Sequence, residues 1–170
     1  MNRVPRSLAN ATAWQQVSHR PADIFATLAC PDSSRSFMML LMFTSEAVTR
    51  NVRVAVRAEY APDRSRPQDQ QWFFLYTITI TNQGTETVQL LTRHWIITDG
   101  DGGVEHVEGP GVVGQQPVLN PGESFTYTSG CPLGTSFGMM EGTYQMTNAG
   151  GEQFDAKIAP FTLSEPYTVH

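Results

Sequence analysis

Basic residues, and lysine above all, are scarce in this sequence. Lys157 is the only lysine among 170 residues, charged residues make up 16% of the chain, and the formal net charge is -5. Proteins that bind nucleic acid normally present a basic face to the phosphate backbone. The composition therefore argues against nucleic acid as a partner. With 40% hydrophobic residues, the chain is apolar enough to bury a core.

Long hydrophobic runs are also missing. The longest, Phe37 to Phe43, has seven residues, whereas a membrane-spanning helix needs about 20. We therefore expect no membrane insertion, and this run is the one part of residues 1–46 with enough apolar area to dock on the folded domain. The two cysteines, Cys30 and Cys131, are too few for a disulfide framework. Free thiols and a cytoplasmic location are the expectation.

A third absence is that of an amphipathic helical window between residues 50 and 170. Apolar and polar residues alternate there with period two, which is typical of half-buried strands. In the most regular segment, Tyr76, Ile78 and Ile80 are expected to face inward. Strands are predicted for residues 52–60, 72–82, 88–98, 104–107, 124–128, 138–147 and 154–158. About seven short strands predict an all-β fold, an antiparallel β-sandwich of the immunoglobulin or fibronectin type III kind.

Within the strand predicted at 88–98, alternation places Leu91, Trp95 and Ile97 on one face. Asp-Gly pairs at residues 99–103 predict a hairpin turn. Residues 61–71 are polar, contain two prolines, and predict a loop.

The chain divides into an N-terminal extension, residues 1–46, and a domain, residues 47–170. The extension lacks a sustained period, and we predict it to be poorly structured or helical. Arg3 and Arg6 occur in it, and no acidic residue precedes Asp23, a bias found in organellar transit peptides. The preferred interpretation is an ordinary flexible extension or a start codon placed too far upstream. An organellar location is the alternative.

Gly109, Gly111 and Gly114 form a G-x-G-x-x-G pattern. A dinucleotide site of this kind needs a helix after the glycines, and Pro117 and Pro121 prevent one. Two interpretations remain. The backbone amides could form a nest for an anion, with Arg93 as the nearest positive charge in sequence. Alternatively, the glycines shape a strand crossing or bulge, which is the interpretation we prefer.

His106 and Glu108 are predicted to lie on one side of a strand, a spacing that suits two metal ligands. Two ligands do not make a site, so they are weak metal candidates, and a surface hydrogen-bonding pair is preferred. Cys131 has no base predicted beside it and is expected to be a small buried or half-buried thiol.

Several motifs, occurring in order, resemble those of the ApaG family. They cover about residues 47–170 and leave residues 1–46 outside. The motifs are Val88-Gln-Leu-Leu-x-Arg-x-Trp-x-Ile-Thr-Asp99, Val107-x-Gly-x-Gly-Val-Val-Gly-x-Gln-Pro117, Pro121-Gly-Glu-x-Phe-x-Tyr-Thr-Ser-Gly130 and Met140-x-Gly-x-Tyr-x-Met146.

The resemblance implies a fibronectin-like β-sandwich without established catalytic residues. Bacterial members are associated with cobalt resistance and magnesium efflux. Eukaryotic members occur in F-box ubiquitin-ligase subunits and polymerase-delta-interacting proteins, where the domain looks like a protein-binding module. Residues 1–46 contain no F-box pattern. The glycine motif has been proposed in the family to bind pyrophosphate or nucleotide.

We therefore expect a non-catalytic ApaG-like binding module without a cofactor, associated with divalent cation (Co2+/Mg2+) homeostasis or protein–protein interaction. The expected partners are another protein and a small anion or nucleotide, with a homodimer through an edge strand as a further expectation. The alternative is a phosphate-, pyrophosphate- or nucleotide-binding protein, including a hydrolase of diadenosine polyphosphates, that uses the Gly109–Gly114 motif.

Overall fold

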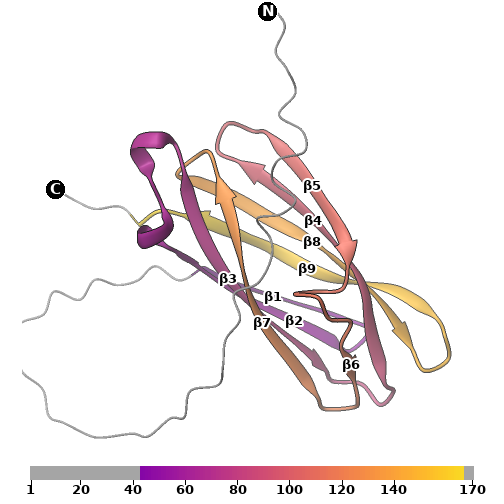
Figure 1. Ribbon diagram of the computed structural model, residues 1–170. Coiled ribbons are helices and arrows are strands. Elements are labelled where there is room, and N and C mark those ends of the chain that lie inside the picture. Colours follow the sequence, from indigo (N-terminus) through magenta and orange to yellow (C-terminus); the bar gives the residue numbers. More distant parts are fainter. Residues whose placement is uncertain (1–42, 167–170) are drawn as a thin grey trace, which may run out of the picture.

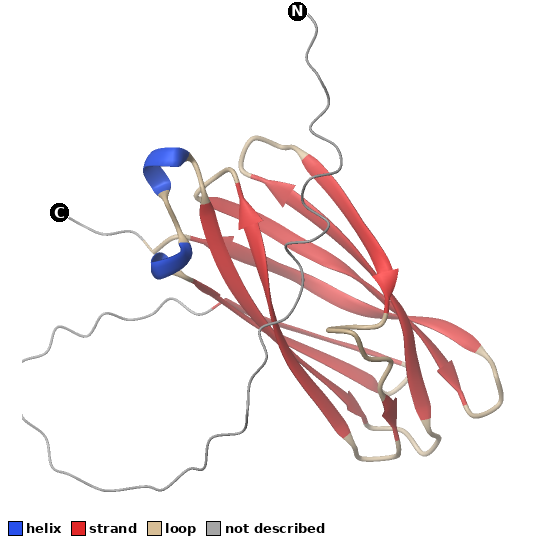
Figure 2. Ribbon diagram, viewed as in Figure 1, coloured by secondary structure: helices blue, strands red, loops and turns tan. Residues whose placement is uncertain are grey.

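The fold is an antiparallel β-sandwich, seen in a computed structural model that describes residues 43–166. One sheet has the strand order β1-β2-β3-β7, and the other has the order β5-β4-β8-β9, with β6 also paired to β4. Figures 1 and 2 show the two sheets packed face to face. The elements are β1 (Phe43–Thr49), β2 (Val52–Tyr60), the 3-10 turns η1 (Pro62–Arg64) and η2 (Pro67–Asp69), β3 (Trp72–Asn82), β4 (Val88–Asp99), β5 (Val104–Pro110), β6 (Val118–Leu119), β7 (Ser124–Leu133), β8 (Phe137–Asn148) and β9 (Gln153–Ser164).

The predicted all-β sandwich is confirmed, and each of the seven predicted strands is present. Two strands were not predicted. β1 begins at Phe43, at the end of the apolar run that hides its alternation, so the predicted boundary at residue 46 falls inside a strand. β6 has only two residues, too few to show a period. The rest of the predicted extension lies outside the described residues.

β3 is an inner strand of the first sheet, and its side chains alternate between the core and the outer face. Ile78 and Ile80 are fully buried and Tyr76 nearly so, as the sequence predicted. The residues between them face out, because successive side chains of a strand point to opposite faces. Within residues 43–166, no helix has the length and hydrophobicity that a membrane crossing requires.

Trp95 of β4 is the centre of an aromatic cluster that joins the two sheets. Its ring lies edge-on to Tyr76 of β3, with ring centroids 5.5 Å apart. It also meets Tyr144 at 6.2 Å and Phe161 at 6.1 Å. Such edge-to-face pairs stabilise a core by about 0.5–1.5 kcal/mol each beyond their area burial.

A β-bulge in β4 corrects one prediction. Leu90 pairs with Met146 and Thr92 with Gln145, which leaves Leu91 as an extra residue without its own partner on β8. Leu90 is fully buried, whereas Leu91 is only half-buried. The prediction that Leu91 shares the inward face of Trp95 is therefore wrong, because one extra residue reverses the alternation.

The interior also contains polar contacts between the sheets, one of them between two tyrosines. The hydroxyls of Tyr127, on β7, and Tyr144, on β8, are 2.5 Å apart. Both side chains are buried, with residue exposures of 7% and 0%. Each hydroxyl thus satisfies the other across the core.

Replacing either Tyr127 or Tyr144 by Phe should lower the free energy of unfolding by about 1–3 kcal/mol, because the remaining hydroxyl is left buried without its partner. The double Phe variant should recover most of that loss. Urea unfolding of the wild type, both single variants and the double variant measures the coupling. Additive losses would show that the two hydroxyls do not depend on each other.

Alkaline pH should destabilise the protein. Burial raises the pKa of Tyr76, Tyr127 and Tyr144 above the ordinary 10.0, and that of the Cys131 thiol above the ordinary 9.0. These groups stay neutral in the folded state but ionise near those values when the chain unfolds. The free energy of unfolding is therefore unaffected by these groups below pH 9.0. At higher pH it falls by about 1.4 kcal/mol per pH unit for each group that is ionised only in the unfolded state.

Urea unfolding at a series of alkaline pH values measures this loss. The double Phe variant lacks two of the four groups, so its stability should fall less steeply above pH 10.0 than that of the wild type. Equal slopes for the two proteins would contradict the assignment.

Candidate functional site

The glycine motif lies where the chain leaves β4 and returns to it. β5 pairs with residues 92–98 of β4, and β6 pairs with residues 88 and 89 of the same strand. Residues 111–117 connect the two, opposite the bulge at Leu91. The Leu91 carbonyl oxygen accepts hydrogen bonds from the Gly111 amide (2.8 Å) and from the Gln116 side chain (2.8 Å). The motif therefore fills an interruption in an edge strand.

The interruption is a miniature hairpin. Val112 and Gln115 exchange backbone hydrogen bonds of 2.8 and 2.9 Å. Between them, Val113 has φ 44° and Gly114 has φ 76°, the two positive values of a type I′ turn. A β-branched residue at positive φ is a genuine outlier. The motif shapes a strand connection, as the preferred interpretation predicted.

Gly111 is required because the hairpin folds back on it. A Cβ at this position would lie 2.2 Å from the carbonyl oxygen of Gln115, and its φ is +58°. The tight fold turns Val112 into the core, where it is only 1% exposed. The hairpin thus closes the side of the sandwich between β5 and β7.

Arg93 binds the glycine motif, but its partners are the carbonyl oxygens of the motif. The Nη1 group donates to the carbonyl oxygens of Pro110 (3.1 Å) and Gly111 (2.8 Å). The guanidinium also covers Gly109, where an added Cβ would lie 3.3 Å from Nη1. The structure therefore brings together Arg93, Gly109 and Gly111 of the four residues proposed for an anion site, whereas Gly114 lies in the turn of the hairpin. The amides of Gly111, Val112 and Gln115 are already bonded within the protein, so an anion that used them would have to displace these bonds.

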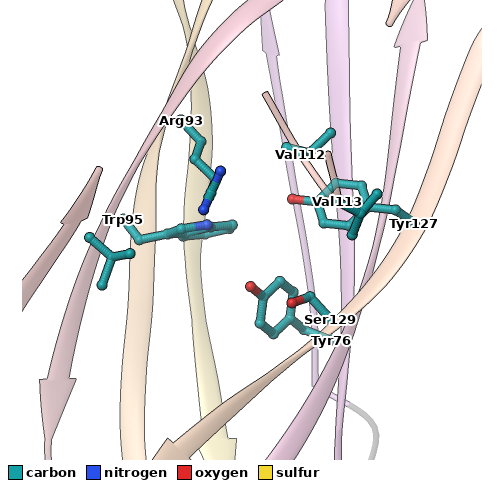
Figure 3. A pocket seen from close by; sticks show the side chains of 8 residues that line it. Tyr76, Arg93, Trp95, Val112, Val113, Tyr127 and Ser129 are labelled. Atoms are coloured by element: carbon teal, nitrogen blue, oxygen red, sulfur yellow. The ribbon is translucent and has the colours of Figure 1, made fainter. Parts of the chain in front are cut away.

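A small cavity lies behind the hairpin (Figure 3). Its volume is about 30 Å³, enough for water but not for a nucleotide. Figure 3 shows the Arg93 guanidinium and the hydroxyls of Tyr76, Tyr127 and Ser129 around it. The wall is completed by Trp95, Val107, Val112 and Val113.

His106 and Glu108 lie together on the outer face of the second sheet, with His94 of β4 beside them. The His94 Nε2 atom is 2.9 Å from His106 Nδ1 and 3.6 Å from Glu108 Oε1. Sequence reasoning missed His94, which comes near only through the pairing of β4 with β5. In the part of the chain that the structure describes, no group of three or more His, Cys, Asp or Glu side chains is placed to hold a metal ion.

The Cys131 thiol is fully buried. Burial raises the pKa of this thiol, which disfavours the thiolate that nucleophilic catalysis needs. The prediction of a buried thiol is confirmed.

The β7 strand is a surface feature that sequence reasoning missed. Among residues 43–166, β7 pairs only with β3 and so forms an edge of the first sheet. Neither β3 nor β7 contains a charged residue. Their outer face carries three cross-strand hydroxyl pairs: Thr77–Thr128 at 2.8 Å, Thr79–Thr126 at 3.0 Å and Thr81–Ser124 at 2.7 Å. The alternation was visible in the sequence, but the edge position depends on strand order.

Comparison with known proteins shows the family. A family model described as the ApaG domain matches residues 62–148. A protein of Bradyrhizobium sp. (strain ORS 278) named Protein ApaG is 55% identical over 120 residues, covering 71% of this chain and 92% of that protein. The Protein ApaG of Mesorhizobium japonicum is 57% identical over 122 residues, covering 72% and 94%.

Solved structures agree with the sequence comparison. The crystal structure of the putative ApaA protein from Bordetella pertussis matches with a TM-score of 0.67 at 51% identity, covering 69% of this chain and 95% of that one. A second X-ray structure, from a structural genomics consortium, matches with a TM-score of 0.66 at 44% identity, covering 73% and 94%.

Gly111→Ala should destabilise the protein more than Gly114→Ala. Both substitutions put a Cβ at positive φ, which costs about 1–2 kcal/mol. Only the Cβ at Gly111 collides with backbone, whereas Gly114 has no atom within 4 Å of an added Cβ. Urea unfolding of the two variants measures the difference, and equal losses would contradict the close approach.

Proposed function

The chain belongs to the ApaG domain family, and from this premise we propose that it is a non-catalytic module that binds an extended strand of another polypeptide along the free edge of β7. The free edge is the side of β7 that is not bonded to β3. The observation that carries the proposal is an edge strand that is paired on one side only among residues 43–166, and whose stretch from Ser124 to Gly130 has neither a charge nor a proline.

Natural edge strands are usually blunted by lysines, bulges, prolines or covering segments, because their unpaired amides and carbonyls attract other strands. In β7 the only such device is Pro132, at the far end of the strand. The stretch from Ser124 to Gly130 contains neither a charge nor a proline. A segment that adds to this edge gains backbone hydrogen bonds, as in other cases of strand addition.

The other sheet edges are less suited to strand addition. β5 carries Glu105 and Glu108 and ends at Pro110. The edges formed by β1 and β9 bond to each other, since Ser45 Oγ donates to the Ala159 carbonyl at 3.0 Å. This contrast supports β7 as the binding edge.

The phosphate- or nucleotide-binding alternative has less support. Arg93 is bonded to two carbonyl oxygens, and the amides of Gly111, Val112 and Gln115 are bonded within the protein. A catalytic role for Cys131 is disfavoured by its burial. The family resemblance implies a role in divalent cation homeostasis. In this proposal the protein acts in that role in the cytoplasm, through the polypeptide that it binds.

Site-specific photo-crosslinking in cells tests the proposal. A photoreactive amino acid replaces Thr126, which is exposed on β7, or Thr162, which is exposed on β9. We expect polypeptide adducts from position 126, and their loss in the Thr128→Pro variant, because proline removes an amide of the edge. The Thr162 position is the matched control.

Equal adducts at both positions, or none at position 126, would contradict binding at the β7 edge. The wild-type protein should not hydrolyse diadenosine polyphosphate. Turnover of that substrate would contradict the non-catalytic assignment.

A further inference from the structure

We infer that the strand which adds to β7 is the β7 strand of a second copy of this chain, so that two four-stranded sheets join into one continuous sheet across a two-fold axis. This inference rests on the proposed function. It follows from which backbone groups point to the free edge, from the symmetry of those groups, and from the side chains beside them.

The hydrogen-bond pattern identifies the free groups. Asn82 is bonded to residues 122 and 123 at the start of β7, and Ala61 donates to Phe73 on the opposite side of β3. Because the direction of backbone bonds alternates along a strand, even-numbered residues of β3 bond to β7, and their odd-numbered partners on β7 bond back. The even-numbered residues of β7 therefore point to the free edge: Ser124, Thr126, Thr128, Gly130 and Pro132.

These groups are self-complementary. When two β7 strands run antiparallel about an axis through Tyr127, Thr126 of one copy lies opposite Thr128 of the other, and Ser124 lies opposite Gly130. All four free amides in each copy then face a free carbonyl. Shifting the strands by one residue in each copy brings Pro132 or the preceding turn into the pairing. The axis at Tyr127 is therefore the register we assign.

The side chains at the edge agree with this register. The outer face of β3 and β7 already pairs hydroxyl with hydroxyl, and the pairing of Thr126 with Thr128 of the second copy continues that ladder. The chain has a net charge of -5, but no charge lies on β3 or β7, so two copies meet without like charges directly opposite each other. A β5–β5 pairing would bring Glu105 and Glu108 of both copies together.

Sedimentation equilibrium of the full chain across the micromolar range tests the inference. The wild type should form a dimer. Thr126→Lys should weaken dimerisation by about tenfold or more, because it places like charges at the joint. Thr79→Lys is the matched control, since it adds the same charge to the same face and breaks the same Thr79–Thr126 contact, but lies one strand inside the edge. It should leave the dimer intact.

Disulfide trapping tests the register. In a Cys30→Ser background, where Cys131 remains buried, Thr126→Cys mixed with Thr128→Cys should give a crosslinked heterodimer more readily than either variant alone. Opposite residues in such a pair have Cα atoms about 5.5 Å apart, a span that a disulfide can bridge. Preferential trapping of either variant with itself would place the axis elsewhere and overturn the assigned register.

The outcomes separate the inference from the proposed function. A monomeric wild type, or equal effects of Thr126→Lys and Thr79→Lys, would overturn the dimer. If position 126 then crosslinks to a different polypeptide, the proposed function stands and only the second copy is excluded. If position 126 crosslinks to nothing, both fail.

Discussion

Closure of the side of the sandwich between β5 and β7 is the constraint on which the rest of the structure depends. Two sheets that pack face to face leave their interior open where their edges diverge, and here Val112 fills that opening. It reaches the core only because Gly111 allows the chain to double back against Gln115. Arg93 holds the result in place from β4. The glycine motif is therefore accounted for by packing.

Much of the fold could be predicted because a single strand is recognisable from the alternation of its own residues. The alternation of residues in β3 was enough to predict which of its side chains face inward. The prolines after the glycine motif were enough to exclude a helix there. Both predictions use only residues that are neighbours in the sequence. Leu91 shows the limit of such reasoning. A bulge is a property of two paired strands, and the sequence of β4 alone does not show where its partner on β8 falls out of step.

The candidate site also has a part that could be predicted from the sequence and a part that could not. Arg93 was associated with the glycines from sequence, and the structure does place it against them, but the sequence could not show that its contacts are carbonyl oxygens. His94 and the β7 edge were missed for a related reason. Each depends on which strands become neighbours, and strand order in a sandwich is decided by contacts between residues far apart in the chain.

The hydrogen bond between Tyr127 and Tyr144 has a mechanical consequence. Apolar side chains restrain the relative position of two sheets through their shape, because close-packed side chains interdigitate. A bond between two ring-tip oxygens adds a restraint whose strength depends on distance and direction. The bond therefore favours one relative position of β7 and β8. It connects the sheet that ends in the free edge of β7 to the sheet whose outer face carries His94 and His106, so a ligand on either surface has a defined orientation toward the other.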